Sequence, residues 1–183
     1  VGGAAIVVGG GTAGAVAAIV LAEAGVSVLV VERLNCLGGT GTAGQIEGYY
    51  YGSRGGLYEV LDAESKAWEP WGYTPSGASN YNAVLKKRVL EARLRRAGAE
   101  IAYEADLTGV VMEGERVVGV EYARDDGLHL AYAQVVVDAT AEAYVCLLAG
   151  ADYELGRRSD GKPQPYSAVR TVLATDPLRV GHA

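Results

Sequence analysis

The amino-acid sequence predicts an α/β fold built around a parallel sheet. Residues 4–33 read as strand, glycine-rich turn, helix, strand and acid, and an amphipathic helical pattern at 82–97 leads into a strand pattern at 100–103. Short alternating runs joined by Gly-containing acidic turns follow, before a β-branched run at 135–137. Strands that alternate with helices are typical of parallel sheets, and alternating runs with such turns are typical of hairpins.

The turn after the first strand carries Gly9, Gly11 and Gly14 in the G-x-G-x-x-G spacing. This spacing allows a tight turn, a close approach of backbone N–H groups to a pyrophosphate, and close packing of the helix on the sheet. A helix N-terminus holds phosphates through its unpaired N–H groups and its dipole. The stretch therefore predicts a dinucleotide site; a plain glycine-rich turn is the alternative.

Glu32 lies 18 residues beyond Gly14, at the end of the second predicted strand, 27–31. A carboxylate at this place accepts hydrogen bonds from both hydroxyls of an adenosine ribose. It also repels a 2′-phosphate, which argues against NADP. The alternative of a plain turn leaves this acid unexplained.

Composition narrows the function classes. The chain has 183 residues, a length sufficient for one domain or slightly more. Half of its residues are apolar, and its net charge is −6. The negative charge gives no general attraction to nucleic acid or to an anionic membrane. The apolar stretch 13–31 lacks a basic flank and is interrupted at Gly25, so it reads as buried core. Cys36 and Cys146 form no disulfide framework, and a reducing cytoplasm is expected.

Two loops are candidates for contact with a ligand. The glycine-rich loop 33–44 follows Glu32 directly, so Gly38, Gly39 and Thr40 are placed to run along a dinucleotide, unless the loop is simply a flexible surface segment. Segment 45–80 is rich in aromatic and turn residues around a predicted helix at 57–68. It is a candidate pocket wall, with core or interface as the alternatives. Arg54 either meets an anion or is a plain surface arginine.

The helix predicted at 82–97 places Leu85, Val89 and Ala92 on an apolar face. Its basic residues are expected on a solvated face rather than at a nucleic-acid interface; they are Lys86, Lys87, Arg88, Arg93, Arg95 and Arg96. Beyond it, the predicted elements are strands at 100–103, 107–112, 116–123, 128–133 and 135–137, turns at 113–115 and 125–127, a helix at 143–149 and a possible strand at 168–174.

Residues 9–14, 31–33 and 37–40, followed by Gly44 and the Tyr-Tyr-Tyr-Gly tract at 49–52, resemble the N-terminal half of FAD-dependent oxidoreductases of the glutathione-reductase-like superfamily, in particular those related to fumarate-reductase-type flavoproteins. The resemblance implies FAD rather than NAD. It implies a Rossmann-like FAD-binding domain over 1–165 with a three-stranded antiparallel β-meander as its crossover. Residues 166–183 would then begin a substrate domain that is otherwise absent.

The same resemblance implies where the cofactor lies: its pyrophosphate on the first glycine turn, its ribose on Glu32, and its ribityl chain and flavin beyond loop 37–44. The residues implied in cofactor binding are Gly9, Gly11, Thr12, Ala13, Gly14, Glu32, Arg33, Gly38, Gly39, Thr40, Leu107, Ala139 and Thr140. Leu107 would contribute backbone beside the adenine. Ala141 stands where the family has Gly, which adds a Cβ at a turn expected to need an unusual backbone conformation.

The function expected is the FAD-binding portion of a flavin-dependent oxidoreductase that acts on a small-molecule substrate and is completed by further chain or a partner subunit. One alternative is a non-catalytic Rossmann-like module that works through oligomerisation, and another is an NAD-dependent dehydrogenase. No catalytic residue is identified: His129 and His182 read as structural or exposed, and Cys36 lacks a paired cysteine in its loop. No metal-ligand cluster is expected, and no nucleic-acid or membrane partner.

Overall fold

The computed structural model describes residues 2–48, 55–68, 81–154 and 156–162. The chain divides into two compact units, 1–151 and 152–183. All the described helices and strands belong to the first unit. Arg54, His182, the possible strand at 168–174 and half of the aromatic segment 45–80 lie outside the described residues.

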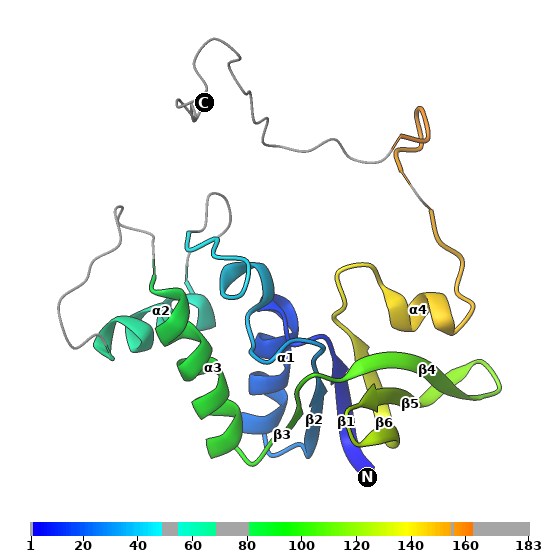
Figure 1. Ribbon diagram of the computed structural model, residues 1–183, viewed down its shortest axis with the longest axis horizontal. Helices are drawn as coiled ribbons and strands as arrows, with labels where there is room; N and C mark the ends of the chain where they lie inside the picture. The colour runs from blue at the N-terminus through cyan, green and yellow to red at the C-terminus, as the bar shows by residue number, and fades with distance from the viewer. Residues whose placement is uncertain (1, 49–54, 69–80, 155, 163–183) are drawn as a thin grey trace. The chain divides into compact units, whose positions relative to one another are not determined.

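A six-stranded sheet forms the centre of the first unit, in the order β3-β2-β1-β6-β5-β4 (Figure 1). Its strands are β1 (Gly2–Val8), β2 (Val28–Val31), β3 (Glu100–Ala102), β4 (Asp106–Glu113), β5 (Arg116–Arg124) and β6 (Gly127–Asp138). Strands β3, β2, β1 and β6 pair in parallel, and β6, β5 and β4 pair antiparallel. The α/β fold with a parallel sheet and a three-stranded meander is confirmed.

Strand β6 corrects one detail of the prediction. The runs 128–133 and 135–137, expected as separate strands, are one strand of 12 residues. Residues 127–132 pair antiparallel with β5, while 132–138 pair parallel with β1. Gln134 breaks the apolar pattern because its side chain is exposed, but strand pairing uses backbone groups and continues through it. The third meander strand therefore leads straight back to the glycine turn.

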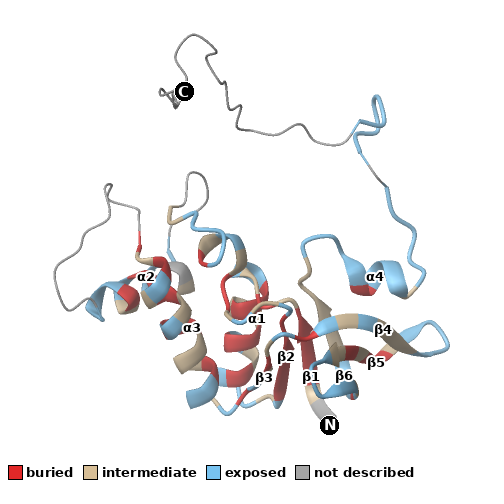
Figure 2. Cartoon of the chain, in the orientation of Figure 1, coloured by how far each residue is buried: buried red, intermediate tan, exposed pale blue. Residues whose placement is uncertain are grey.

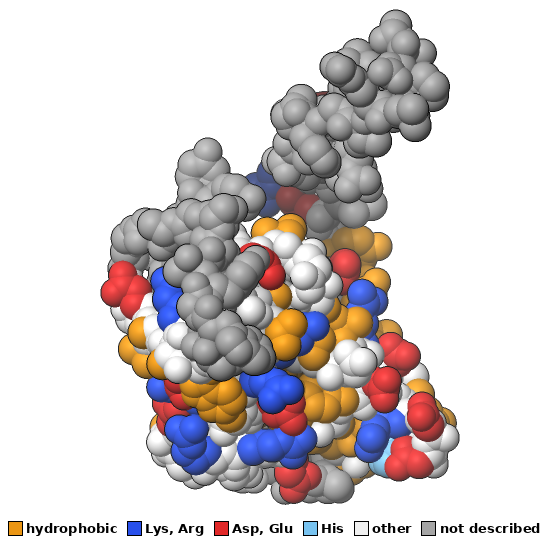
Figure 3. All heavy atoms as spheres, turned by 60° about the vertical axis from the view of Figure 1, so that its left-hand side comes forward, with side chains coloured by type: hydrophobic (Ala, Val, Ile, Leu, Met, Phe, Trp, Pro, Cys, Tyr) orange, Lys and Arg blue, Asp and Glu red, His pale blue; other side chains and the backbone are white. Residues whose placement is uncertain are grey.

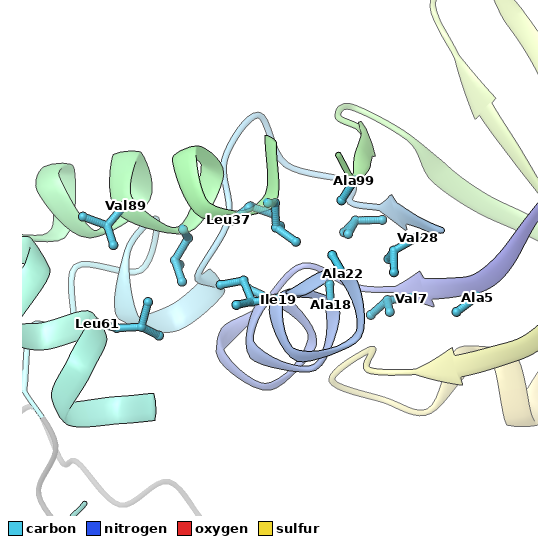
Figure 4. Close-up of a cluster of buried hydrophobic side chains, with 14 residues drawn as sticks. Ala5, Val7, Ala18, Ile19, Ala22, Val28, Leu37, Leu61, Val89 and Ala99 are labelled. Atoms are coloured by element: carbon cyan, nitrogen blue, oxygen red, sulfur yellow. The ribbon is translucent and has the colours of Figure 1, made fainter. Parts of the chain in front are cut away.

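Two hydrophobic cores lie on opposite faces of the parallel strands. On one face, helices α1 (Thr12–Glu23), α2 (Leu57–Ala67) and α3 (Ala83–Arg96) pack over β1 and β2. Figure 2 shows the buried residues concentrated in these strands and in α1. Ile19, Leu61 and Val89 bring the three helices into one cluster (Figure 4). On the other face, the meander and the short helix α4 (Tyr144–Leu148) pack on Ile6, Val8, Leu29 and Val31.

Helix α3 is one residue shorter at each end than predicted, and Asn82 caps it by accepting hydrogen bonds from the N–H groups of Val84 and Leu85 (2.9 and 3.2 Å). The expectation that all its basic residues are solvated is wrong for Lys86, which is 4% exposed. The reason is that α2 packs on this side of α3, where Asp62 faces the Lys86 ammonium at 3.8 Å. The same ammonium lies 3.8 Å from the centroid of the Tyr81 ring.

The remaining charged surface is mixed in sign. On the face that Figure 3 shows, Lys and Arg side chains alternate with Asp and Glu side chains. Arg93 pairs with Glu64 and Glu23, and Arg95 pairs with Glu91. Much of the positive charge of α3 is therefore neutralised by neighbouring carboxylates, and this face carries no broad basic surface of the kind that attracts nucleic acid. None of the described helices has the length and apolar character needed to span a bilayer.

Candidate dinucleotide-binding site

The first and third glycines of the motif are required by close backbone contacts. Gly9 has φ of +92°, and a Cβ at this residue would lie 2.6 Å from the carbonyl oxygen of Ala139. A Cβ at Gly14 would lie 1.8 Å from the carbonyl oxygen of Gly9. Both positions therefore exclude any side chain, and α1 packs directly against the turn.

The second glycine faces open space. Gly11 is the N-cap of α1 with φ of −61°, and a Cβ there would meet nothing within 4 Å. No side chain caps this helix end. The first N–H groups of a helix have no partner within the helix, so this end offers donors beside an open space. That combination suits a diphosphate.

Glu32 lies beside the same turn. Its carboxylate is not directed into solvent: the residue is 5% exposed, and the Gly10 N–H donates to Oε2 (2.6 Å) while the Leu34 N–H donates to Oε1 (2.7 Å). These bonds orient the carboxylate between the turn and the end of β2. Because a carboxylate oxygen accepts two hydrogen bonds, each retains capacity for a ribose hydroxyl.

The loop after Glu32 packs against the turn. The Gly38 N–H donates to the Gly10 carbonyl (2.8 Å), and the Thr12 hydroxyl donates to the Gly38 carbonyl (3.1 Å). A Cβ at Gly39 would lie 3.1 Å from the Gly11 Cα. Gly38 and Gly39 therefore pack beside the N-terminus of α1; that they run along a dinucleotide stays a prediction.

The end of β6 meets the turn from the other side. The Ala139 N–H donates to the Val8 carbonyl (2.8 Å), and the Thr140 nitrogen would lie 3.0 Å from a Cβ at Gly9. Asp138, which the sequence analysis did not single out, accepts hydrogen bonds from Thr140 and from the Cys146 N–H. Its place directly after the β-branched run 135–137 is a signal in the sequence, whereas its contacts with Thr140 and Cys146 appear only in the fold.

The turn after β6 differs from expectation at Ala141. Its φ does not lie in the left-handed region; Ala143, two residues later, has φ of 55° and ψ of 45° there. The Cβ of Ala141 therefore creates no backbone strain in this conformation.

The other expected residues lie at the edge of the site. The N–H groups of Glu104 and Ala105 donate to the carbonyls of Leu34 and Glu32 (3.2 and 3.1 Å), so the chain enters β4 beside the acid. Leu107, in β4, packs against the second core. The structure thus brings the glycines, Glu32, Ala139 and Thr140 to one end of the sheet. Thr12, Ala13, Arg33 and Thr40 are exposed there.

The described part of the chain contains no cluster of three His, Cys, Asp or Glu residues that could hold a metal ion. His129 stacks on Tyr122 with ring centroids 5.1 Å apart and lies 2.8 Å from Asp126, near the β5–β6 turn. This turn is at the opposite end of β6 from Asp138. His129 is therefore part of the hairpin and not of the candidate site.

Comparison with known proteins gives matches at the family, sequence and fold levels. The family model described as FAD dependent oxidoreductase matches residues 5–182. Digeranylgeranylglycerophospholipid reductase 2 of Methanopyrus kandleri is 34% identical over 148 residues, which cover 73% of this chain and 36% of that protein. Thiamine thiazole synthase of Aeropyrum pernix is 38% identical over 118 residues, covering 63% of this chain and 42% of that protein.

Among solved structures, THI4 of Thermovibrio ammonificans has the same fold, with a TM-score of 0.63 and 24% identity, over 84% of this chain and 65% of that one. The chain spans between 36% and 42% of the length of the curated relatives that it matches. These matches confirm the resemblance carried by residues 9–14, 31–33 and 37–40. The chain belongs to the FAD dependent oxidoreductase family, whose cofactor is FAD.

Proposed function

We propose that this chain is the FAD-binding portion of an oxidoreductase that acts on a small-molecule substrate and is completed by further chain or by a partner subunit. Residues 1–165 form the FAD-binding domain, and 166–183 begin a substrate domain. Cys36 and Cys146 are free thiols, in keeping with a reducing compartment such as the cytoplasm. Family membership and a length of 36% to 42% of the curated relatives support this proposal.

The observation that carries the proposal is the open space at Gly11 beside the buried carboxylate of Glu32. A diphosphate in that space accepts hydrogen bonds from the N–H groups of Thr12 and Ala13, and the dipole of α1 favours its charge. Glu32 accepts the ribose hydroxyls and repels a 2′-phosphate. One cradle therefore selects an adenine dinucleotide without using a basic side chain.

The remaining residues extend this cradle. Gly38, Gly39 and Thr40 border the diphosphate on the side of the loop, and Ala139 and Thr140 border it on the side of β6. Arg33 lies exposed next to Glu32, and the backbone at Leu107 lies at the adenine side. Bound FAD supplies the electron acceptor, while these residues bind and orient it.

Two other functions are separated from this one by their ligands. An NAD-dependent dehydrogenase would bind NADH more tightly than FAD, although the family match favours FAD. A non-catalytic module acting through oligomerisation would bind neither. The glycine contacts around Gly9 and Gly14 argue against such a module, because they keep the turn open at Gly11 rather than filled with side chains.

The test is an equilibrium titration of the purified 183-residue chain with FAD, NADH and NADPH, followed by quenching of protein and flavin fluorescence. The expected result is saturable binding of FAD, weaker binding of NADH and no binding of NADPH. Tighter binding of NADH than of FAD would favour the dehydrogenase. Absence of binding to all three would support the assembly module.

A further inference from the structure

Asp138 is the last residue of β6, and its carboxylate accepts three hydrogen bonds from the turn and the helix that follow. Its Oδ1 accepts from the Thr140 N–H (3.0 Å) and from the Thr140 hydroxyl (2.7 Å), and its Oδ2 accepts from the Cys146 N–H (2.9 Å). None of the ion pairs in the described residues involves Asp138. Hydrogen bonds from neutral groups alone therefore stabilise its charge.

The Thr140 hydroxyl continues this network. It donates to Asp138 and accepts from the Tyr144 N–H (2.7 Å), which belongs to the first residue of α4. Both Tyr144 and Cys146 lie in α4, a helix of five residues that no side chain of its N-cap residue, Ala143, supports. The carboxylate and the hydroxyl together fix how the chain passes from the sheet into this helix.

The segment held in this way is the one that touches the glycine turn. A Cβ at Gly9 would lie 2.6 Å from the Ala139 carbonyl oxygen and 3.0 Å from the Thr140 nitrogen, so there is no room for one. A Cβ at Gly14 would lie 2.9 Å from the Ala139 Cβ. Since these contacts are close, a displacement of Ala139 changes the space that the turn can occupy. Asp138 holds Thr140 through two hydrogen bonds, and Ala139 lies between these two residues in the chain.

We propose that Asp138 is a positioning residue of the FAD site: it locks the β6–α4 turn against Gly9 and Gly14 and thereby shapes the phosphate-binding turn without touching the cofactor. This inference rests on the proposed function. It differs from a role as a simple helix cap, which would affect α4 and stability but not the cofactor.

The ionisation of Asp138 supports this role. Burial by itself raises the pKa of Asp138, but the hydrogen bonds from Thr140 and Cys146 outweigh it and hold the pKa below the ordinary value. The carboxylate therefore stays charged at neutral pH. The pKa of the Cys146 thiol is raised, chiefly by its hydrogen bond to Asp138. The reactivity of this exposed thiol thus reports whether the carboxylate is in place.

The test uses three substitutions and a matched control in the 183-residue chain. Asp138→Asn keeps the shape but loses an acceptor, Thr140→Val loses the hydroxyl, and Thr140→Ser retains it. Asp126→Asn removes a carboxylate at the other end of β6, whose pKa is also lowered by a hydrogen bond, in this case from His129. Thermal unfolding shows that each variant is folded. FAD affinity, alkylation of Cys146 resolved by peptide mass spectrometry, and amide exchange are then measured.

We expect Asp138→Asn and Thr140→Val to weaken FAD binding about tenfold, the usual effect of losing one hydrogen bond to a charged group. Thr140→Ser should bind FAD more tightly than Thr140→Val, and Asp126→Asn should bind it as the unsubstituted chain does. The alkylation profile of Cys146 should shift to lower pH in Asp138→Asn only. Unchanged FAD affinity in a folded Asp138→Asn variant would overturn the inference.

Amide exchange separates this inference from the proposed function. In the FAD-free protein, the N–H groups of Ala139 and Cys146 should exchange about tenfold faster in Asp138→Asn than in the unsubstituted chain. If the unsubstituted chain binds no FAD, the proposed function fails whatever this exchange shows. If it binds FAD but exchange at Ala139 is unchanged, Asp138 does not position the turn.

Discussion

The Gly10 N–H donates a hydrogen bond of 2.6 Å to Oε2 of Glu32, and this bond joins the glycine turn after β1 to the end of β2. The second oxygen of the same carboxylate accepts from the Leu34 N–H. Glu32 thus has a structural role before any ligand arrives, because it fixes the turn on which a diphosphate would lie. The ribose contact that we propose would use its remaining lone pairs.

Replacement of Glu32 by Gln tests both roles. The amide NH2 group opposes one of the two backbone N–H donors, so we expect the free energy of unfolding to fall by about 1–3 kcal/mol, the range for an unsatisfied buried partner. FAD affinity should fall by about tenfold or more, since charge-assisted bonds are the stronger ones. Urea unfolding and FAD titration measure the two effects. Glu113→Gln, at an exposed position in the β4–β5 hairpin, should change stability by less than about 0.5 kcal/mol.

Substitution of Gly14 by Ala should damage the fold. The added Cβ would lie 1.8 Å from the Gly9 carbonyl oxygen, so α1 must move away from the turn. We expect a loss of about 3 kcal/mol in the free energy of unfolding, as for an overpacked core. In Gly109→Ala, the control, the Cβ would make an ordinary contact of 3.5 Å with Glu121. Equal stability of the two variants would show that α1 does not pack against Gly9 as described.

Arg93 should contribute more to stability than its neighbour Arg95. The Arg93 guanidinium, 16% exposed, pairs with Glu64 of α2 (2.8 Å) and Glu23 of α1 (3.2 Å), whereas Arg95, 59% exposed, pairs within α3. Arg93→Met should cost about 1–2 kcal/mol and Arg95→Met about 0.5 kcal/mol or less, because exposed pairs within a helix are weak. Thermal and urea unfolding give the comparison. Indistinguishable variants would mean that Arg93 does not join the three helices.

Lys86 should make stability depend on pH. Burial lowers its pKa from 10.5 to about 8, although the nearby Asp62 raises it in part. Between about pH 8 and 10.5 the unfolded chain then binds more protons at this residue than the folded chain, so stability rises with pH across this window. The gain should be about 2 kcal/mol relative to Lys86→Met. Urea unfolding at pH 7.5 and 10 measures the difference, and parallel slopes for both proteins would contradict the lowered pKa.

The predicted βαβ unit, α3 and the hairpin turns follow from local patterns, which is why the sequence could predict them. Gly114 and Gly127, for example, have the positive φ that such turns favour. Strand β6 is continuous because it pairs with both β5 and β1, and Lys86 is buried because α2 packs beside α3. The local sequence around these residues does not indicate which distant element will pack there.

The candidate site shows the same division. The positions of Gly9, Gly14 and Glu32 beside one turn are predictable because a fixed spacing in the sequence encodes them. Asp138 acts through a turn and a helix that become neighbours only after the sheet forms. Likewise, the left-handed residue is Ala143 rather than Ala141, because the hydrogen bonds of Thr140 place the tight bend immediately before α4.

The most direct measurement is the FAD affinity of Gly11→Ala beside its free energy of unfolding. A Cβ at Gly11 meets no protein atom within 4 Å, so stability should stay within about 1 kcal/mol of the unsubstituted chain. The same Cβ enters the space assigned to the diphosphate, so FAD affinity should fall by about tenfold or more. A stable Gly11→Ala variant that binds FAD as tightly as the unsubstituted chain would show that the diphosphate does not lie on this turn.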